Sequence, residues 1–276
     1  MRWKQFFTPV QSMDAKEAKQ FIEEKPHGTV TILDVRQPSE YQAGHIAGAK
    51  LIPLPEINDR KAEIDRDKPV LVYCAVGGRS RVASQMLSGG DFKEVYNLSG
   101  GYKAWQGQTA LGPEDQGLEL FSGRESVEEI LIVAYSIEKG LREFYLSMAP
   151  GMKDDRAREL FEQLAAIELN HQDRIFAQYL ETTKKDADRE EFDHTVVVTA
   201  MEGGLTTEEY MRLYDFNPAS PRDVVELAMT IEAQALDLYH RAAENHEDEE
   251  SGRALAGIAQ EEQTHLKRLG ELLDRL

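Results

Sequence analysis

One pattern in the second half of the chain limits the fold more than any other feature: the motif Glu-x-x-His occurs twice. Each copy also has a Glu 30 positions before its first residue (168 − 138 and 262 − 232). The two sets are Glu138, Glu168 and His171, and Glu232, Glu262 and His265. Residues three apart lie on one face of an α-helix, so each motif can direct both side chains to one point. The repeat therefore predicts two helical hairpins of one design.

The match between the two sets extends to their flanks. Tyr145 and Tyr239 each follow the upstream Glu by seven positions, and Arg174 and Arg268 each follow the His by three. This pattern resembles the ferritin-like, rubrerythrin-related family over residues 125–276. The resemblance implies an all-α four-helix bundle, in which one Glu from each of two helices and a Glu-x-x-His from each of the other two surround two metal ions.

The six residues suit a pair of divalent cations. Four carboxylates supply four negative charges, which two such ions balance in a place where unpaired charge is costly. Oxygen donors with two imidazoles favour iron, with manganese as the alternative. We expect two metal ions and no organic cofactor. The competing interpretation places these residues among solvated surface charges, which is the usual location of a single Glu on a helix.

The sequence also departs from the rubrerythrin pattern. Ala235 occupies the position, one turn after the third-helix ligand, where that family has an additional Glu. Cys74 is the only cysteine, so a four-cysteine iron site of the rubredoxin type is excluded. An external electron donor is therefore expected.

Charge is distributed unevenly along the chain. Residues 1–110 contain 15 Lys and Arg and 13 Asp and Glu, a net charge of +2. The remaining residues contain 17 Lys and Arg and 37 Asp and Glu, a net charge of −20, so the whole chain has a net charge of −18. An acidic half of this kind repels nucleic acid and anionic lipid, so we expect neither as a partner. The sequence shows no signal peptide and no apolar stretch of ~18 residues, so we expect a cytoplasmic protein.

The first half alternates strand and helix patterns. Apolar runs at 29–35, 50–54, 70–74 and 94–98 predict strands, and a helix is expected from Ser12, with further helices near 56–64 and 80–88. This order predicts an α/β fold with a mainly parallel sheet flanked by helices.

Cys74 follows one of these strands, at the sheet edge where such folds bind ligands. The loop from Cys74 contains two adjacent glycines and leads directly into a helix; its other members are Ala75, Val76, Gly77, Gly78, Arg79 and Ser80. Inward-facing backbone N–H groups and a helix N-terminus stabilise a thiolate, so the pKa of Cys74 is predicted to lie below the ~8.5 of a free thiol.

Four segments in order resemble the rhodanese family over about residues 20–106. They are Leu33-Asp34-Val35-Arg36, the run from Glu40 to Ala49, the Cys74 loop, and the run from Asn97 to Trp105. The resemblance implies a sulfurtransferase in which Cys74 takes up a sulfane sulfur as a persulfide and passes it to a thiophilic acceptor. Small sulfur donors and thiol acceptors are the partners it implies, with Arg79 and the loop binding the anion.

Two alternatives remain for this half. Cysteine-dependent phosphatases place five residues between Cys and Arg, whereas Cys74 and Arg79 enclose four, which favours sulfur transfer. Asp34 and Arg36 are either part of the substrate site or a structural ion pair.

A Gly-rich segment separates the halves, which predicts a domain at 1–108, a linker at 109–124 and a helical domain at 125–276. Long helices are predicted at 125–149, 154–182, from Ser220-Pro221, and from 249 to the end. The connector at 183–219 supplies the long crossover that a ferritin-like bundle requires. Within it, Val196–Val198 is expected to pack on the bundle or on a partner, and Thr206 to begin a short helix. We expect a homodimer through the helical domain.

The sequence thus predicts a sulfurtransferase fused to a dinuclear iron oxidoreductase with possible peroxidase activity. One alternative is a sulfur carrier joined to a metal-binding or storage bundle without redox turnover. Another is a metal-free bundle that serves only as a dimerisation scaffold.

Overall fold

The protein, seen in a computed structural model, divides into two compact units, Met1–Glu114 and Asp115–Leu276. The structure describes residues 10–26, 28–90, 92–105, 109–195, 217, 220–273 and 275–276. The division falls inside the segment predicted as a linker.

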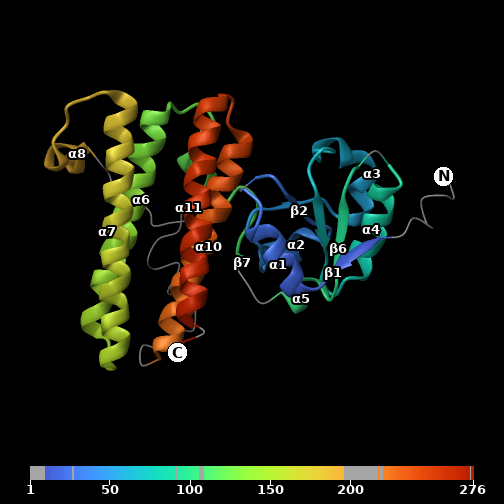
Figure 1. The fold of residues 1–276 in the computed structure, drawn as a ribbon, viewed down its shortest axis with the longest axis horizontal. Coiled ribbons are helices and arrows are strands. Elements are labelled where there is room, and N and C mark those ends of the chain that lie inside the picture. The colour runs from blue at the N-terminus through green and yellow to red at the C-terminus, as the bar shows by residue number, and fades with distance from the viewer. Residues whose placement is uncertain are drawn as a thin grey trace. The chain divides into compact units, whose positions relative to one another are not determined.

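The first unit contains a five-stranded sheet in which every pair of neighbours is parallel (Figure 1). In spatial order the strands are β1 (Gln11–Met13), β6 (Val95–Leu98), β5 (Val70–Tyr73), β2 (Thr31–Asp34) and β4 (Ala49–Leu51). A separate antiparallel pair joins β3 (His45–Ile46) to β7 (Thr109–Ala110). The helices are α1 (Ala15–Glu23), α2 (Pro38–Gln42), α3 (Ile57–Arg60), α4 (Gly78–Ser88) and α5 (Gly101–Ala104). The predicted α/β class is confirmed.

Alternation along the strands explains why both faces of this sheet are covered. Val70 and Val72 pack in one apolar cluster with Leu87 of α4. Leu71 packs in a second cluster with Ala18 of α1. Successive side chains of a strand point to opposite faces, and a parallel sheet buries both of them.

The predicted element boundaries need three corrections. Residues 11–13 form β1, and the helix expected from Ser12 begins at Ala15 after an Asp14 cap. The helix expected at 56–64 is the single turn α3 followed by a 3-10 turn. Part of the predicted linker is β7, so the first unit extends beyond residue 108.

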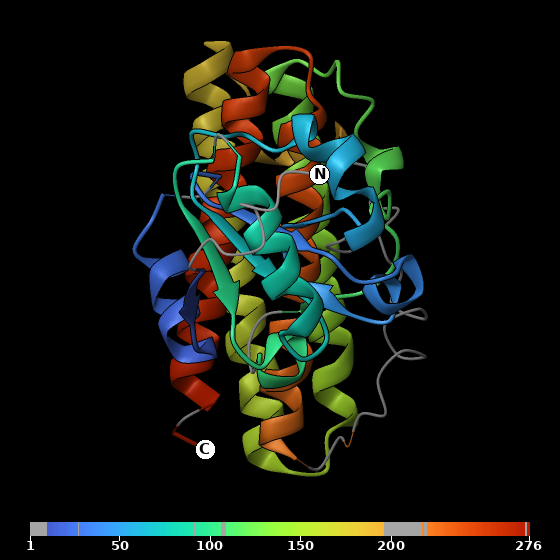
Figure 2. The ribbon, with the colours of Figure 1, turned by 90° about the vertical axis from the view of Figure 1, so that its right-hand side faces the viewer.

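The second unit contains four long helices that run side by side in both views (Figure 1, Figure 2). They are α6 (Val127–Met148), α7 (Asp155–Thr183), α10 (Pro221–Asn245) and α11 (Glu249–Leu273). The short helix α8 (Arg189–Thr195) follows α7. The predicted helical bundle is confirmed, whereas Val196–Val198 and the helix expected from Thr206 lie outside the described residues.

Local capping sets where these helices begin. The Ser126 side chain accepts a hydrogen bond from the Glu129 amide, and Glu129 accepts from the Ser126 amide, which forms a capping box. The Asp154 side chain caps α7 by accepting a hydrogen bond from the Ala157 amide at 3.0 Å. Ser220 caps α10, with Pro221 in its first turn, as the sequence predicted.

One apolar cluster of the bundle core lies on one side of the Glu and His residues. It contains Leu141 and Phe144 of α6, Phe161 and Leu164 of α7, and Ile231 of α10, all 2% exposed or less. This packing fixes the helix rotations that direct Glu138 and Glu168 inward. None of the described helices is long and apolar enough to cross a membrane.

One close backbone approach holds the Cys74 loop in place. Gly101 has φ +59°, and a Cβ atom there would lie 2.2 Å from the Cys74 carbonyl oxygen. The amides of Tyr102 and Lys103 donate hydrogen bonds to the carbonyl oxygens of Cys74 and Ala75 (2.7 and 3.0 Å). Only glycine suits this position, so the start of α5 sets the position of the loop.

Candidate functional site

Cys74 lies directly after β5, at the carboxyl edge of the sheet, and the loop from it leads into α4. Gly77 adopts φ +95° and its amide donates to the Cys74 Sγ at 3.1 Å. The Ser80 hydroxyl lies 3.5 Å from the same sulfur atom. The loop thus surrounds the sulfur with donors, as the two glycines predicted.

These donors change the acidity of the thiol. Burial opposes ionisation, but hydrogen bonds from the Ser80 hydroxyl and from the amides of Ser80, Val76 and Gly77 lower the pKa of Cys74 below its usual value. The pKa direction that the sequence predicted is therefore confirmed. Cys74 is only 1% exposed, so a donor molecule must enter the loop to reach the sulfur.

Ser80 belongs to a buried chain of hydrogen bonds that the sequence did not reveal. Its hydroxyl oxygen lies 2.7 Å from the Asn97 Oδ1 as well as 3.5 Å from the sulfur, and its one proton can bond to either atom; the Asn97 amide lies 3.4 Å from the Ser12 hydroxyl. Asn97 is on β6, the strand beside β5. These hydrogen bonds fix the orientation of the Ser80 side chain beside the Cys74 sulfur atom.

Arg79 forms a bidentate ion pair with Glu40, with both N–O distances at 2.7 Å. This pairing lowers the pKa of Glu40 to about 2. Arg79 also interacts electrostatically with Cys74, and its side chain is 36% exposed. Glu40 was not among the predicted site residues, although it lies in the motif that begins Glu40-Tyr41; it holds the guanidinium at the loop.

Asp34 and Arg36 are placed away from solvent. They are 0% and 3% exposed and pair with each other, and Arg36 also donates to the Gly44 carbonyl oxygen at 2.7 Å. Arg36 lies over the rings of Tyr73 and Tyr102. These contacts favour the interpretation of Asp34 and Arg36 as a structural ion pair over a role in the substrate site.

In the second unit the structure brings the six predicted ligands together. They form two triads whose ligand atoms lie within 4.8 Å of one another, Glu138 with Glu168 and His171, and Glu232 with Glu262 and His265. The two imidazole rings stack with centroids 3.6 Å apart. We call these six residues the Glu/His cluster. The first triad comes from α6 and α7 and the second from α10 and α11, as the repeat predicted.

Each histidine directs its Nδ1 atom at the carboxylates of its own triad. His171 Nδ1 lies 2.8 Å from Glu168 and 3.3 Å from Glu138. His265 Nδ1 lies 3.1 Å from Glu262 and 3.5 Å from Glu232. The opposite Nε2 atom of His265 lies 3.3 Å from the Arg174 guanidinium. One of the two repeated arginines thus reaches the ligand of the other hairpin.

Burial and mutual repulsion shape the electrostatics of the cluster. Burial, followed by the charges of Glu232 and Glu138, raises the pKa of Glu168 well above its usual value. Burial and Glu232 do the same for Glu262. Burial alone would lower the pKa of His265, but hydrogen bonds to Glu232 and Glu262 raise it to about 10. The cluster therefore lacks the positive charge that would keep all four carboxylates ionised.

The residues present fit a pair of metal ions. The Oε1 atoms of Glu168 and Glu262 are buried and have no hydrogen-bond partner among the described residues. Unpaired buried oxygen atoms are costly and are the atoms that a cation would bind. Four carboxylates and two imidazoles are a donor set suited to iron or manganese. Ala235 is fully buried and supplies no further ligand.

Comparisons with known proteins agree with this division of the chain. Residues 14–108 match the family model of a rhodanese-like domain, and residues 129–273 match that of rubrerythrin. The thiosulfate sulfurtransferase GlpE of Ectopseudomonas mendocina is 34% identical over 101 residues, which cover 35% of this chain and 92% of that protein.

Two other similar proteins are less informative about activity. The uncharacterized protein YqhL of Bacillus subtilis is 48% identical over 77 residues, 28% of this chain, and the chain spans 61% of its length. The crystal structure of a rhodanese-like domain protein from Staphylococcus aureus is 33% identical, with 35% of this chain and 91% of that chain covered and a TM-score of 0.32.

Replacing Ser80 with Ala is expected to raise the pKa of Cys74, because a donor to the thiolate is lost. The rate of alkylation by iodoacetamide, followed against pH, should shift its midpoint upward by roughly half a pH unit or more. Ser84→Ala, in the next turn of α4, is the matched control and should leave the midpoint unchanged. Equal midpoints for Ser80→Ala and the unmodified protein would contradict this role.

The full-length protein is expected to bind two ferrous ions per chain in anaerobic titrations. Glu138→Ala removes one ligand and should weaken binding of at least one ion by about 100-fold. Glu143→Ala, an exposed Glu on the same helix, serves as the control and should bind as the unmodified protein does. Fewer than two ions per unmodified chain, or the same loss in both variants, would contradict the metal centre.

Proposed function

Because residues 14–108 belong to the rhodanese-like family and residues 129–273 to the rubrerythrin family, we propose that the chain combines a sulfurtransferase with a two-metal oxidoreductase. The sulfurtransferase is the more directly supported activity. Its support is the arrangement of Cys74 in a loop of inward donors, together with the similarity to a protein named thiosulfate sulfurtransferase.

In the first step, the Cys74 thiolate attacks the outer sulfur atom of thiosulfate. A new S–S bond forms at Cys74, the S–S bond of thiosulfate breaks, and sulfite leaves with the electron pair. A thiophilic acceptor such as cyanide then attacks the outer sulfur of the persulfide and leaves as thiocyanate, which restores the thiolate. No external oxidant or reductant is required.

The loop residues support both steps. The hydrogen bonds that lower the pKa of Cys74 increase the fraction present as thiolate, the reactive form. Arg79, which is held by Glu40, places a guanidinium group beside the loop. The anionic sulfur donor and the sulfite product bind in this loop. The four-residue spacing between Cys74 and Arg79 is consistent with a persulfide rather than a phosphate.

In the second unit we assign the reduction of peroxide or oxygen to the Glu/His cluster. When bound, two iron ions would supply open coordination positions and two electrons. Glu138, Glu168 and His171 would hold one ion, and Glu232, Glu262 and His265 the other. The six residues are at most 4% exposed, so the surrounding helices exclude bulk water from the reaction. With Cys74 as the only cysteine, the electrons must come from an external carrier.

Full-length protein is expected to form thiocyanate from thiosulfate and cyanide. Cys74→Ser should lower this rate by about 10³-fold or more, because the nucleophile is lost. The Glu138→Ala variant is the control, and its thiocyanate production should be unchanged. Equal rates for Cys74→Ser and the unmodified protein would remove Cys74 from the mechanism.

The ferrous form of the full-length protein is expected to be oxidised by hydrogen peroxide faster than free ferrous iron, by roughly tenfold or more. Stopped-flow absorbance of the ferric product measures this rate, and Cys74→Ser should show the same rate as the unmodified protein. Oxidation no faster than that of free iron would instead support metal binding or storage without redox turnover.

A further inference from the structure

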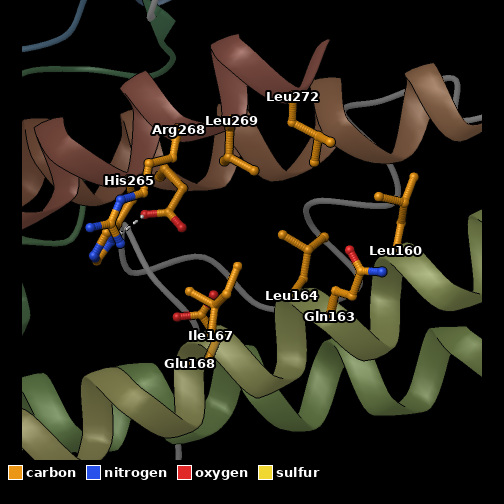
Figure 3. Close-up of a pocket in the computed structure, with 10 residues that line it drawn as sticks. Leu160, Gln163, Leu164, Ile167, Glu168, His265, Arg268, Leu269 and Leu272 are labelled. Atoms are coloured by element: carbon orange, nitrogen blue, oxygen red, sulfur yellow. Dashed lines mark ion pairs between the residues drawn. The ribbon is translucent and has the colours of Figure 1, made fainter. Parts of the chain in front are cut away.

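A pocket of about 80 Å³ lies between α7 and α11 and reaches the Glu/His cluster (Figure 3). Its walls are mostly apolar and come from both helices: Leu160, Leu164, Ile167, Leu269 and Leu272. Glu168 and His265 lie at one end in Figure 3, and Leu160 and Leu272 lie at the other.

The deep end of this pocket is chemically distinct from its walls. Glu168 and Glu232 line it, both are at most 2% exposed, and the Oε1 atom of Glu168 has no hydrogen-bond partner among the described residues. The exposed residues Gln163 and Arg268 also line the pocket; in Figure 3 Arg268 lies toward the His265 end and Gln163 toward the Leu160 end. A ligand that fits this arrangement has an apolar body and an oxygen group at the end beside the cluster.

The apolar walls distinguish between peroxides. Hydrogen peroxide is small and polar, and it gains nothing from five aliphatic side chains. The pocket volume of about 80 Å³ exceeds the roughly 10–15 Å³ of cavity that holds one water molecule. Each methylene group that a ligand buries against such walls strengthens binding roughly fourfold.

We propose that this pocket binds the alkyl group of a short organic hydroperoxide and directs its O–O group to the Glu/His cluster. The proposal rests on the peroxide reduction assigned above to the same cluster and specifies its substrate class. In the overall reaction the O–O bond breaks, and two protons from solvent and two electrons, one from each of two molecules of a one-electron carrier protein, convert the hydroperoxide to an alcohol and water. The alkyl group is not changed.

Two residues of α7 provide a matched pair of variants. Ile167 lines the pocket and is 38% exposed, whereas Leu169, two positions later, is 40% exposed and does not line it. A larger side chain is tolerated at both because both reach solvent. Ile167→Phe should narrow the pocket, and Leu169→Phe should not affect it. Leu272→Phe narrows the opposite end as a second, independent variant.

The first experiment measures binding without turnover. Saturation-transfer NMR of the full-length protein with 1-butanol, the alcohol product analogue, should show saturable binding. We expect Leu169→Phe to bind as the unmodified protein does, and Ile167→Phe and Leu272→Phe to bind roughly fourfold or more weakly, which corresponds to the loss of about one buried methylene group. Absence of saturable binding, or equal affinity in all variants, overturns the proposal.

The second experiment compares two peroxides with the iron-loaded protein. The rate with butyl hydroperoxide relative to that with hydrogen peroxide should fall roughly tenfold in Ile167→Phe and stay constant in Leu169→Phe, because only the first variant loses alkyl contacts. Oxidation by hydrogen peroxide with no reaction of butyl hydroperoxide overturns this substrate class alone. Failure of both peroxides to oxidise the iron overturns the peroxidase function as well.

Discussion

Four carboxylates lie together in the core of the helical unit, each at most 2% exposed. Gathering four buried negative charges is costly, and the positive charge of His265 does not balance them. Burial raises the pKa of Glu168 and Glu262 for this reason. The apolar packing around Leu141, Phe161 and Ile231 therefore surrounds acidic side chains whose mutual repulsion two bound cations would relieve.

The first unit stabilises negative charge by another means. It has a single thiolate to accommodate, and backbone amides with the Ser80 hydroxyl suffice to lower the pKa of Cys74. The donors depend on backbone geometry that few side chains permit, namely φ +95° at Gly77 and the close approach at Gly101. Ion pairs such as Arg79–Glu40 lie at the edge of this site rather than in its centre.

Much of both units could be predicted because their patterns are local. The 30-residue spacing and the Glu-x-x-His motif give the ligands of the cluster, and the order Cys74, Gly77, Arg79 gives the loop. Contacts between distant segments could not be predicted in this way. Asn97 reaches Ser80 only because β6 lies beside β5, and Glu40 reaches Arg79 across 39 positions. Strand β1 has three residues, too few for alternation to show, and β7 pairs with a strand far away in the chain.

The claim that matters most is that the core of the bundle holds two metal ions between its triads. Anomalous diffraction at the iron absorption edge, from crystals of protein grown with ample iron, tests it directly. The account predicts two adjacent anomalous peaks, one beside Glu138 and His171 and the other beside Glu232 and His265. No peak among these residues, or peaks only at surface carboxylates, would contradict it.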